Sequence, residues 1–208
     1  MSWYEWFALV ALFVCIVSCI LHFSKIISMG NPPEYARRSG NVGKAIRYSF
    51  TGAMSPRVKE SAYLHLPTYM AGIMYHLGTF LAIALFFFFL ANISLPGVVY
   101  TGAAIFLAIS GLSGIAILVK RISKSGLRKL SNPDDYISNL LVTLFQLASA
   151  LMLVYPEFGK WYFIASGLLM FYFPLGKLKH AVYFFAARYH LGFFYGWRNV
   201  WPPKPARK

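Results

Sequence analysis

The chain has 208 residues, of which 58% are hydrophobic and 12% are charged, and its mean hydropathy is +0.56. Because a soluble domain of this length carries roughly 25% charged residues, this composition excludes a separate soluble enzyme and predicts one membrane domain. The formal net charge of +14 is compatible with nucleic-acid binding, but the distribution of the charges along the chain argues against that function.

Several apolar stretches are long enough to cross a bilayer as a helix, which takes roughly 20 apolar residues. The stretches lie at about 3–29, 66–92, 98–119, 136–155 and 161–187. The start, MSWYEWF, has no basic region before its apolar run, so we expect the first stretch to be a span and not a cleaved signal peptide. The sequence therefore predicts an all-α, five-helix transmembrane bundle over residues 1–187, followed by a basic, aromatic tail over 188–208.

The Lys and Arg residues are divided unequally between the two sides of this predicted bundle. Nineteen of the 20 fall on one side, and only Lys160 falls on the other. Because Lys and Arg are enriched in cytoplasmic loops, the N-terminus is predicted outside and the C-terminus in the cytoplasm. We expect a multi-pass protein of the cytoplasmic (inner) membrane. The basic loops can meet anionic lipid headgroups or an acidic partner protein, so they do not require nucleic acid.

Two histidines lie inside predicted spans, where ionisable residues are rare and are candidates for function. His76 lies about ten residues into the second span and His180 about eight residues before the end of the fifth, so similar membrane depths are expected. Gly72 and Gly176 each precede one of them by four residues, on the same helical face. Bare backbone beside two facing imidazoles is typical of a haem site. The alternative is hydrogen bonding between helices, with the glycines as close-packing positions.

Basic and aromatic residues surround this candidate site in the sequence. Lys177, Lys179 and Arg188 flank it on the predicted cytoplasmic side and are candidates to pair with haem propionates. Basic residues at the end of a span also extend to the headgroups without any ligand. Tyr75, next to His76, is a candidate for contact with a cofactor. These residues therefore qualify as binding candidates, but none of them identifies the ligand by itself.

The three remaining histidines, His22, His65 and His190, lie near the predicted cytoplasmic boundary. They are interpreted either as hydrated interfacial residues or as part of a quinone site, since imidazole can donate a hydrogen bond to a quinone and relay protons. A second haem built from two of them is a further alternative. Among other polar residues, Asn139 and Gln146 are seven apart on one face of the fourth span, and hydrogen bonding between helices is favoured over contact with a quinone.

Three motifs give the chain a family resemblance. MYHLG at 74–78, LVKRISKSGLRKLSNPDDYISNLLVTLFQ at 118–146 and FPLGKLKH at 173–180 resemble the cytochrome b (gamma) subunit of respiratory nitrate reductase and the related membrane subunits of heterodisulfide reductases. The resemblance covers nearly the whole chain and implies one b-type haem ligated by His76 and His180.

The resemblance also bears on a second haem. The family's nitrate-reductase members carry one nearer the outer face, and its ligand positions correspond to Phe86 and Tyr162 here. Phenylalanine cannot bind iron, so we expect a single haem b in this chain. Cys15 and Cys19 are read as small packing residues, and the chain has no cysteine cluster for an iron–sulfur centre of its own.

The resulting hypothesis is a haem b-binding membrane subunit of an anaerobic-respiratory-type oxidoreductase complex. It would pass electrons between a membrane quinone, expected to be menaquinone, and the iron–sulfur centres of a cytoplasmic iron–sulfur or heterodisulfide-reductase-like subunit. No catalytic residue of its own is expected. The segment 30–64, the linker 120–135 and the tail are the expected docking surface. The alternative is a haem-free membrane anchor or assembly subunit that recruits a soluble partner through the same basic loops.

Overall fold

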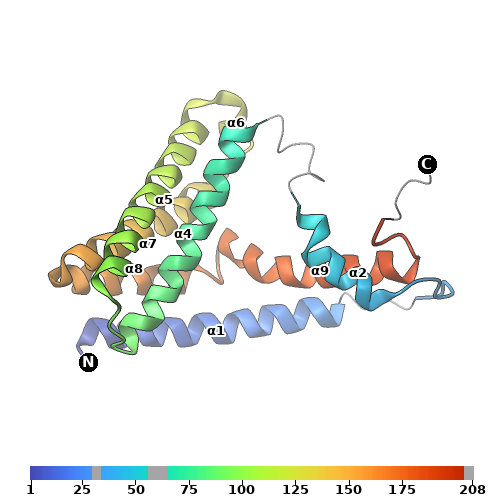
Figure 1. The fold of residues 1–208 in the computed structure, drawn as a ribbon, viewed down its shortest axis with the longest axis horizontal. Helices are drawn as coiled ribbons and strands as arrows, with labels where there is room; N and C mark the ends of the chain where they lie inside the picture. The colour runs from blue at the N-terminus through green and yellow to red at the C-terminus, as the bar shows by residue number, and fades with distance from the viewer. Residues whose placement is uncertain (30–33, 56–64, 204–208) are drawn as a thin grey trace. The chain divides into compact units, whose positions relative to one another are not determined.

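The structure is a computed structural model that describes residues 1–29, 34–55 and 65–203, and every regular element within these residues is helical (Figure 1). The elements are α1 (Trp3–Met29), α2 (Val42–Phe50), η1 (Gly52–Met54), α4 (Leu66–Leu90), α5 (Gly97–Ser123), α6 (Ser125–Lys129), α7 (Pro133–Val154), η3 (Pro156–Phe158), α8 (Gly159–Tyr172), η4 (Lys177–Lys179) and α9 (His180–Trp197). The chain forms two compact units. The first comprises Met1–Ile16 and Leu66–Leu178, and the second comprises Val17–His65 and Lys179–Lys208.

The part of the chain that the structure describes contains four helices long and apolar enough to cross a membrane, namely α1, α4, α5 and α7. Their lengths of 22 to 27 residues match the thickness of a hydrocarbon core. The all-α class is confirmed for these residues, and the chain is a multi-pass membrane protein.

The predicted fifth span, 161–187, is not one helix. α8 ends at Tyr172, the backbone turns through Phe173 to Gly176, and α9 begins only at His180. Pro174 explains the interruption because it has no amide hydrogen and its ring clashes with the preceding helical turn. With 14 residues, α8 is about 21 Å long, which is less than the hydrocarbon core of about 30 Å. A continuous fifth span is therefore wrong, and a count of five spans is not confirmed.

Glycines set the close approach of helices in the first unit, where α5 packs on α4 and α7. A Cβ atom on Gly78 of α4 would lie 2.0 Å from Ser110 Oγ of α5. A Cβ on Gly111 would lie 2.5 Å from the Leu147 side chain, and one on Gly114 would lie 2.4 Å from Tyr75. Small residues at these positions let the backbones approach, as in other membrane bundles.

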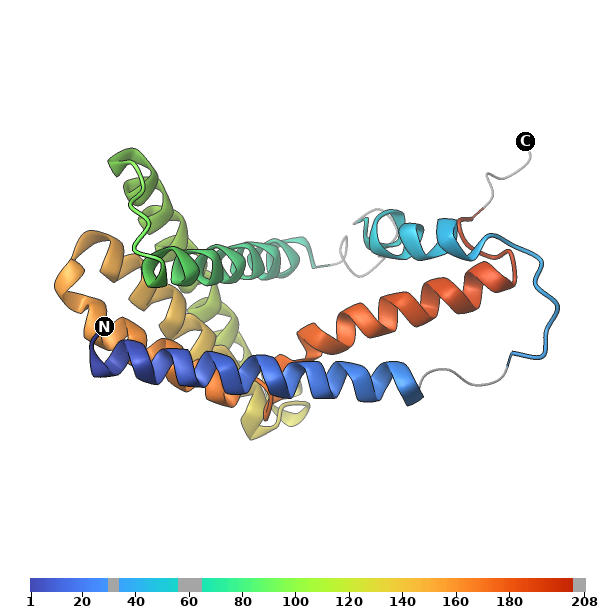
Figure 2. The same ribbon diagram turned by 90° about the horizontal axis from the view of Figure 1, so that it is seen from below.

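The second unit is built from α2 packed against α9 (Figure 2). Gly192 and Gly196 lie one turn apart on α9. A Cβ on Gly192 would lie 2.5 Å from Ile46 Cα, and one on Gly196 would lie 2.6 Å from Ala45 Cβ. The α9 helix continues to Trp197, so the predicted boundary between bundle and tail at 187/188 falls inside a helix.

The segment before α2 is tied to the end of α9. Ser39 N–H donates to the Trp197 carbonyl at 2.9 Å, and the Trp197 indole N–H donates to the Ala36 carbonyl. Arg198 forms an ion pair with Glu34 at 2.8 Å. We call residues 34–50 together with 184–201 the clasp. Two segments predicted as separate loops thus form one folded element.

Candidate functional site

The α4 side of the predicted haem site is an open helical face. A Cβ atom on Gly72 would have no atom within 4 Å among the residues that the structure describes. His76, one turn further on, is exposed, and Phe80, another turn on, is 66% exposed. Residues four apart share a face, so Gly72, His76 and Phe80 form one open stripe. The close-packing alternative for Gly72 is not supported, in contrast to Gly78 on the same helix.

Tyr75 faces the interior of the bundle. Its hydroxyl donates to the Asn139 carbonyl at 2.9 Å and lies 3.1 Å from Thr143 Oγ1. The residue therefore joins α4 to α7, which is a different role from the expected contact with a cofactor. The side-chain oxygen of Asn139 accepts from Thr143 Oγ1 of the same helix at 3.4 Å. The side chain of Asn139 therefore does not join two helices through this bond, and it is the backbone carbonyl of Asn139 that connects α7 to α4.

Gln146 is fully buried at the centre of a hydrogen-bond network between helices. Its Nε2 donates to the Tyr75 carbonyl at 2.9 Å and to Thr79 Oγ1 at 2.7 Å, and its Oε1 accepts from Ser110 Oγ at 2.7 Å. Both ends of the amide are satisfied, as burial of a polar group requires. The predicted hydrogen bonding between helices is confirmed for Gln146.

The α9 side of the predicted site differs from the expectation. Gly176 lies in the turn before η4, so it does not share a helical face with His180, and that prediction is wrong. A Cβ on Gly176 would lie 2.4 Å from the Tyr172 ring and 2.7 Å from Asp134 Oδ1. The packing of the turn therefore accounts for this glycine. His180 is exposed at the first position of α9. The membrane depth predicted for His180 assumed one continuous helix over 161–187, which the structure does not have.

Lys177 binds a carboxylate of the protein. Its ammonium group donates to Asp135 Oδ1, and Arg121 lies 3.7 Å from Asp135 Oδ2. Asp135 is 7% exposed and also caps α7, where its side chain accepts from Asn132 N–H at 3.0 Å. This cluster anchors the turn that precedes α9. The sequence signal for it was the capping pattern Asn-Pro-Asp-Asp, which sequence reasoning did not connect with Lys177.

In the second unit, His22 lies beside the face of α9 that carries His180. The rings of His22 and Tyr183 lie 6.3 Å apart, edge to face. Tyr183 follows His180 by three residues on α9, and so shares its face. His190 is further along α9, and its buried Nε2 has no hydrogen-bond partner among the described residues. His22, His180 and His190 thus belong to one unit, whereas His76 belongs to the other.

Three other predicted residues lie outside any shared site. His65 is exposed in the turn before α4. Lys179 is half-buried in η4. The Arg188 guanidinium lies 5.5 Å from the centre of the Phe184 ring, and the Arg188 carbonyl accepts from Ser49 Oγ. The described residues contain no group of three or more His, Cys, Asp or Glu side chains arranged to bind a metal ion.

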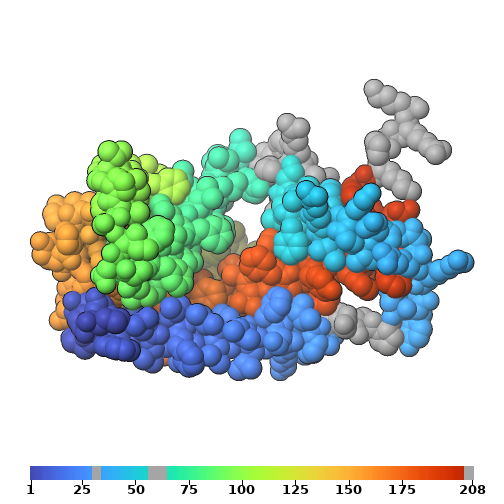
Figure 3. All heavy atoms as spheres, turned by 60° about the horizontal axis from the view of Figure 1, so that its bottom comes forward, coloured from blue at the N-terminus to red at the C-terminus, as the bar shows by residue number. Residues whose placement is uncertain are grey.

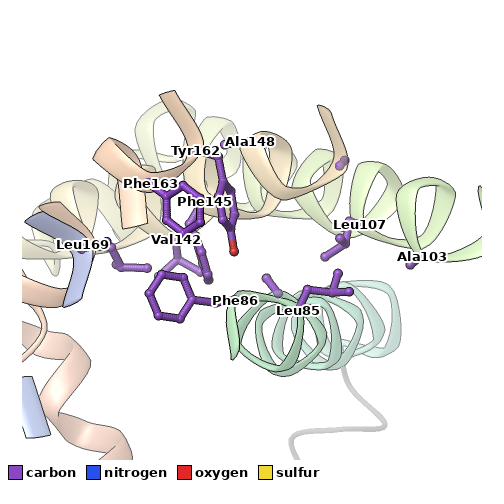
Figure 4. Packing of buried hydrophobic residues seen from close by; sticks show 13 residues of the cluster. Leu85, Phe86, Ala103, Leu107, Val142, Phe145, Ala148, Tyr162, Phe163 and Leu169 are labelled. Atoms are coloured by element: carbon purple, nitrogen blue, oxygen red, sulfur yellow. The ribbon is translucent and has the colours of Figure 1, made fainter. Parts of the chain in front are cut away.

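The positions that correspond to a second haem are part of an aromatic core in the first unit (Figure 4). Phe86 of α4 and Tyr162 of α8 are fully buried, with ring centres 6.4 Å apart. Phe145 of α7 stacks on Tyr162 at 6.0 Å, and Phe163 lies 6.2 Å from Phe86. Close-packed interiors leave few voids, so these side chains fill the space between α4, α7 and α8.

Comparison of the chain with protein-family models, with curated proteins and with solved structures gave no match. The class of protein, a multi-pass helical membrane protein, therefore rests on the helices themselves.

Proposed function

We propose that this chain is a haem b-binding membrane subunit of a quinone-linked oxidoreductase complex, with His76 and His180 as the axial ligands. The observation that carries the proposal is the open stripe on α4. Gly72 has space beside it for a planar group, and His76 projects from the same face one turn away. The space beside Gly78 of the same helix is instead filled by Ser110, and Gly102 of α5, which is as open as Gly72, has no histidine one turn away.

Haem bound there would supply reversible one-electron transfer. The residues of the chain would hold the ring and set its surroundings. The imidazoles of His76 and His180 would bind the iron, and the apolar side chains of α4, including Phe80, would exclude water and lower the local dielectric. A membrane quinone, expected to be menaquinone, and an iron–sulfur partner subunit complete the proposed route. Chemical conversion of a substrate would belong to that partner.

The test is haem content. The full chain, purified from cells supplied with a haem precursor, is expected to bind about one haem b, measured as the pyridine haemochrome. A potentiometric titration of the same sample should give a single one-electron wave. Folded protein without haem would contradict the proposal and favour the haem-free anchor that recruits a soluble partner.

We further propose that the chain crosses the inner membrane five times, with the N-terminus outside, the C-terminus in the cytoplasm, and α8 as part of a discontinuous last crossing. Broken helices occur at membrane depth where protein groups satisfy the backbone. At the break, the Gly176 N–H donates to the Tyr172 carbonyl at 3.0 Å, and the Tyr172 hydroxyl donates to Asp134. The charge asymmetry, with Lys160 alone on one side, sets the orientation.

This orientation predicts a labelling pattern in right-side-out membrane vesicles. In a chain with Cys15 and Cys19 replaced by serine, Lys160→Cys should react at once with a membrane-impermeant maleimide. Lys129→Cys in α6 should react only after the membrane is permeabilised. Both side chains are exposed in the structure, so a difference between them reports the side of the membrane. The reverse pattern would contradict the proposed orientation.

A further inference from the structure

The clasp is held together by contacts along its whole length. Ser49 Oγ of α2 donates to the Arg188 carbonyl of α9 at 2.7 Å. The Trp201 ring lies 4.7 Å from Tyr195 and 5.6 Å from Tyr48. Together with the pairs at Ser39, Ala36 and Glu34, these contacts fix the backbone of the clasp before any partner binds. A surface that is already ordered loses less conformational entropy on binding.

The outward surface of the clasp carries charge of one sign. Arg37, Arg38, Lys44 and Arg47 are exposed. Glu34, the acidic residue among the described residues of the clasp, forms an ion pair with Arg198. Lys44 and Arg47 lie three apart on α2, on the face opposite the buried Ala45 and Ser49. Figure 3 shows α2, in cyan, at the surface over α9, in red. The clasp therefore offers a basic face, and the carboxylate among its described residues, Glu34, is already paired with Arg198.

From these observations we infer that the outward face of the clasp is the docking surface for a folded, acidic, soluble protein. A lipid surface is the less suitable occupant. A helix that lies in the membrane interface buries its apolar face among lipids. The large apolar side chains that the clasp leaves exposed, such as Phe185 and Phe194, belong mainly to α9, whereas Ala45 of α2 is fully buried against α9 and the opposite side of α2 is basic. Tyr35 is 92% exposed beside Arg37 and Arg38, and Tyr and Arg dominate the energetic centres of protein interfaces.

The inference rests on one part of the proposed function, namely that the chain binds a soluble partner subunit. It does not depend on the proposed haem. It also narrows the predicted docking surface from three basic segments to the clasp, which joins parts of two of them and leaves out the linker 120–135. In the linker, α6 has five residues, and all residues from 124 to 130 are exposed. Because α6 buries none of its residues, fewer tertiary contacts support it than support the clasp. The clasp, which is already packed, is the better surface.

The experiment measures binding of a plant-type ferredoxin, a small acidic iron–sulfur protein, to the full chain in nanodiscs of zwitterionic lipid. The clasp variant is Lys44→Glu/Arg47→Glu. The matched control is Arg128→Glu/Lys129→Glu in α6, which makes the same change of charge on exposed side chains. Basic cytochrome c serves as a probe of opposite charge. Far-UV circular dichroism reports whether the clasp has folded, as does tryptophan fluorescence in a background where Trp3, Trp6 and Trp161 are replaced by phenylalanine, so that only Trp197 and Trp201 emit.

We expect ferredoxin to bind the wild type with an affinity that falls as salt is raised, and to bind the clasp variant about tenfold or more weakly. The α6 control should bind within about twofold of the wild type, and cytochrome c should not bind. If the clasp variant is unfolded, Lys44→Gln/Arg47→Gln replaces it and should give a smaller loss. Equal losses in the clasp and α6 variants, or no ferredoxin binding, would overturn the inference.

The lipid alternative has its own readout. Soluble dioctanoyl phosphatidylglycerol is added to the detergent-purified chain, and thermal stability is measured. We expect the same small effect on the wild type and on the clasp variant. Stabilisation of the wild type alone would identify an anionic headgroup as the occupant and would overturn the protein-docking inference. Haem content plays no part in these measurements, so haem-free protein that binds ferredoxin would contradict the proposed cofactor and leave the docking surface standing.

Discussion

Replacing His76 with alanine is expected to abolish the haem absorption of the purified chain, and replacing His180 is expected to do the same. A b-type haem is held without covalent attachment, so the two iron–nitrogen bonds are the main directional contacts that position it. The measurement is the reduced-minus-oxidised difference spectrum together with the pyridine haemochrome, both normalised to protein. His65→Ala is the matched control, because this exposed histidine lies before α4, and it should keep its full haem content.

Gly72→Leu gives an independent version of the same test. The space beside Gly72 is open within the described part of the chain, so the larger side chain should leave the fold and thermal stability nearly unchanged. It would, however, occupy the place proposed for the ring. We expect loss of haem from a stable protein. Full haem retention in Gly72→Leu would show that the ring does not lie against this face.

The variant His22→Ala tests whether the haem ligands lie in the second unit instead. Its ring packs against Tyr183, on the α9 face that His180 begins. If His22→Ala loses haem and His76→Ala keeps it, the ligands belong to the second unit alone, and the role proposed for α4 is wrong. If His22→Ala keeps its haem, as we expect, His22 is left as a packing or quinone-contacting residue.

Replacing Asp135 with alanine is expected to lower the free energy of unfolding by about 2–3 kcal/mol. Loss of a helix N-cap partner costs about 0.5–2 kcal/mol, and loss of a buried carboxylate that two cations bind adds to it. The full cost of a buried pair is not expected, because the Lys177 side chain is 54% exposed and can recover water. Unfolding of the detergent-solubilised protein by heat or by denaturant is the measurement.

A double-mutant cycle separates the two contributions. Asp135→Asn keeps a side-chain oxygen for the cap but removes the charge, and Lys177→Gln removes the facing cation. We expect their effects to be less than additive, because they share one interaction. Glu157→Ala, at an exposed carboxylate in η3, should change stability by less than about 0.5 kcal/mol. Strictly additive effects of Asp135→Asn and Lys177→Gln would show that the ion pair does not stabilise the fold.

Apolar length predicted the helices of the membrane region well, because a run of about 20 apolar residues has few other stable states. Apolar length gave the wrong result at 161–187, because mean hydropathy depends on the side chains alone and carries no information on backbone geometry. Pro174 and Gly176 lie within an apolar run but end a helix. The role predicted for Gly176 failed for the same reason, since spacing by four has meaning only within a helix.

Tertiary contacts were beyond the reach of sequence patterns. Gln146 was predicted correctly because a buried amide must find partners, yet its partners Thr79 and Ser110 could be known only from the packing. The clasp was missed because the segment 30–64 and the tail each look like a basic loop. Gly192 and Gly196 are spaced for close helix contact, but nothing in the sequence identifies α2 as the helix they meet.

The order of synthesis limits when the clasp can form. Ser49 and Arg188 are 139 positions apart in the chain, so α2 leaves the ribosome long before α9 exists to cover its apolar side. Until then the side of α2 that packs on α9 has no partner within the clasp, and the clasp has not formed. Chains that stop before α9 is made therefore cannot present the basic face of the clasp. A partner that recognises the folded clasp would select chains in which translation has passed α9.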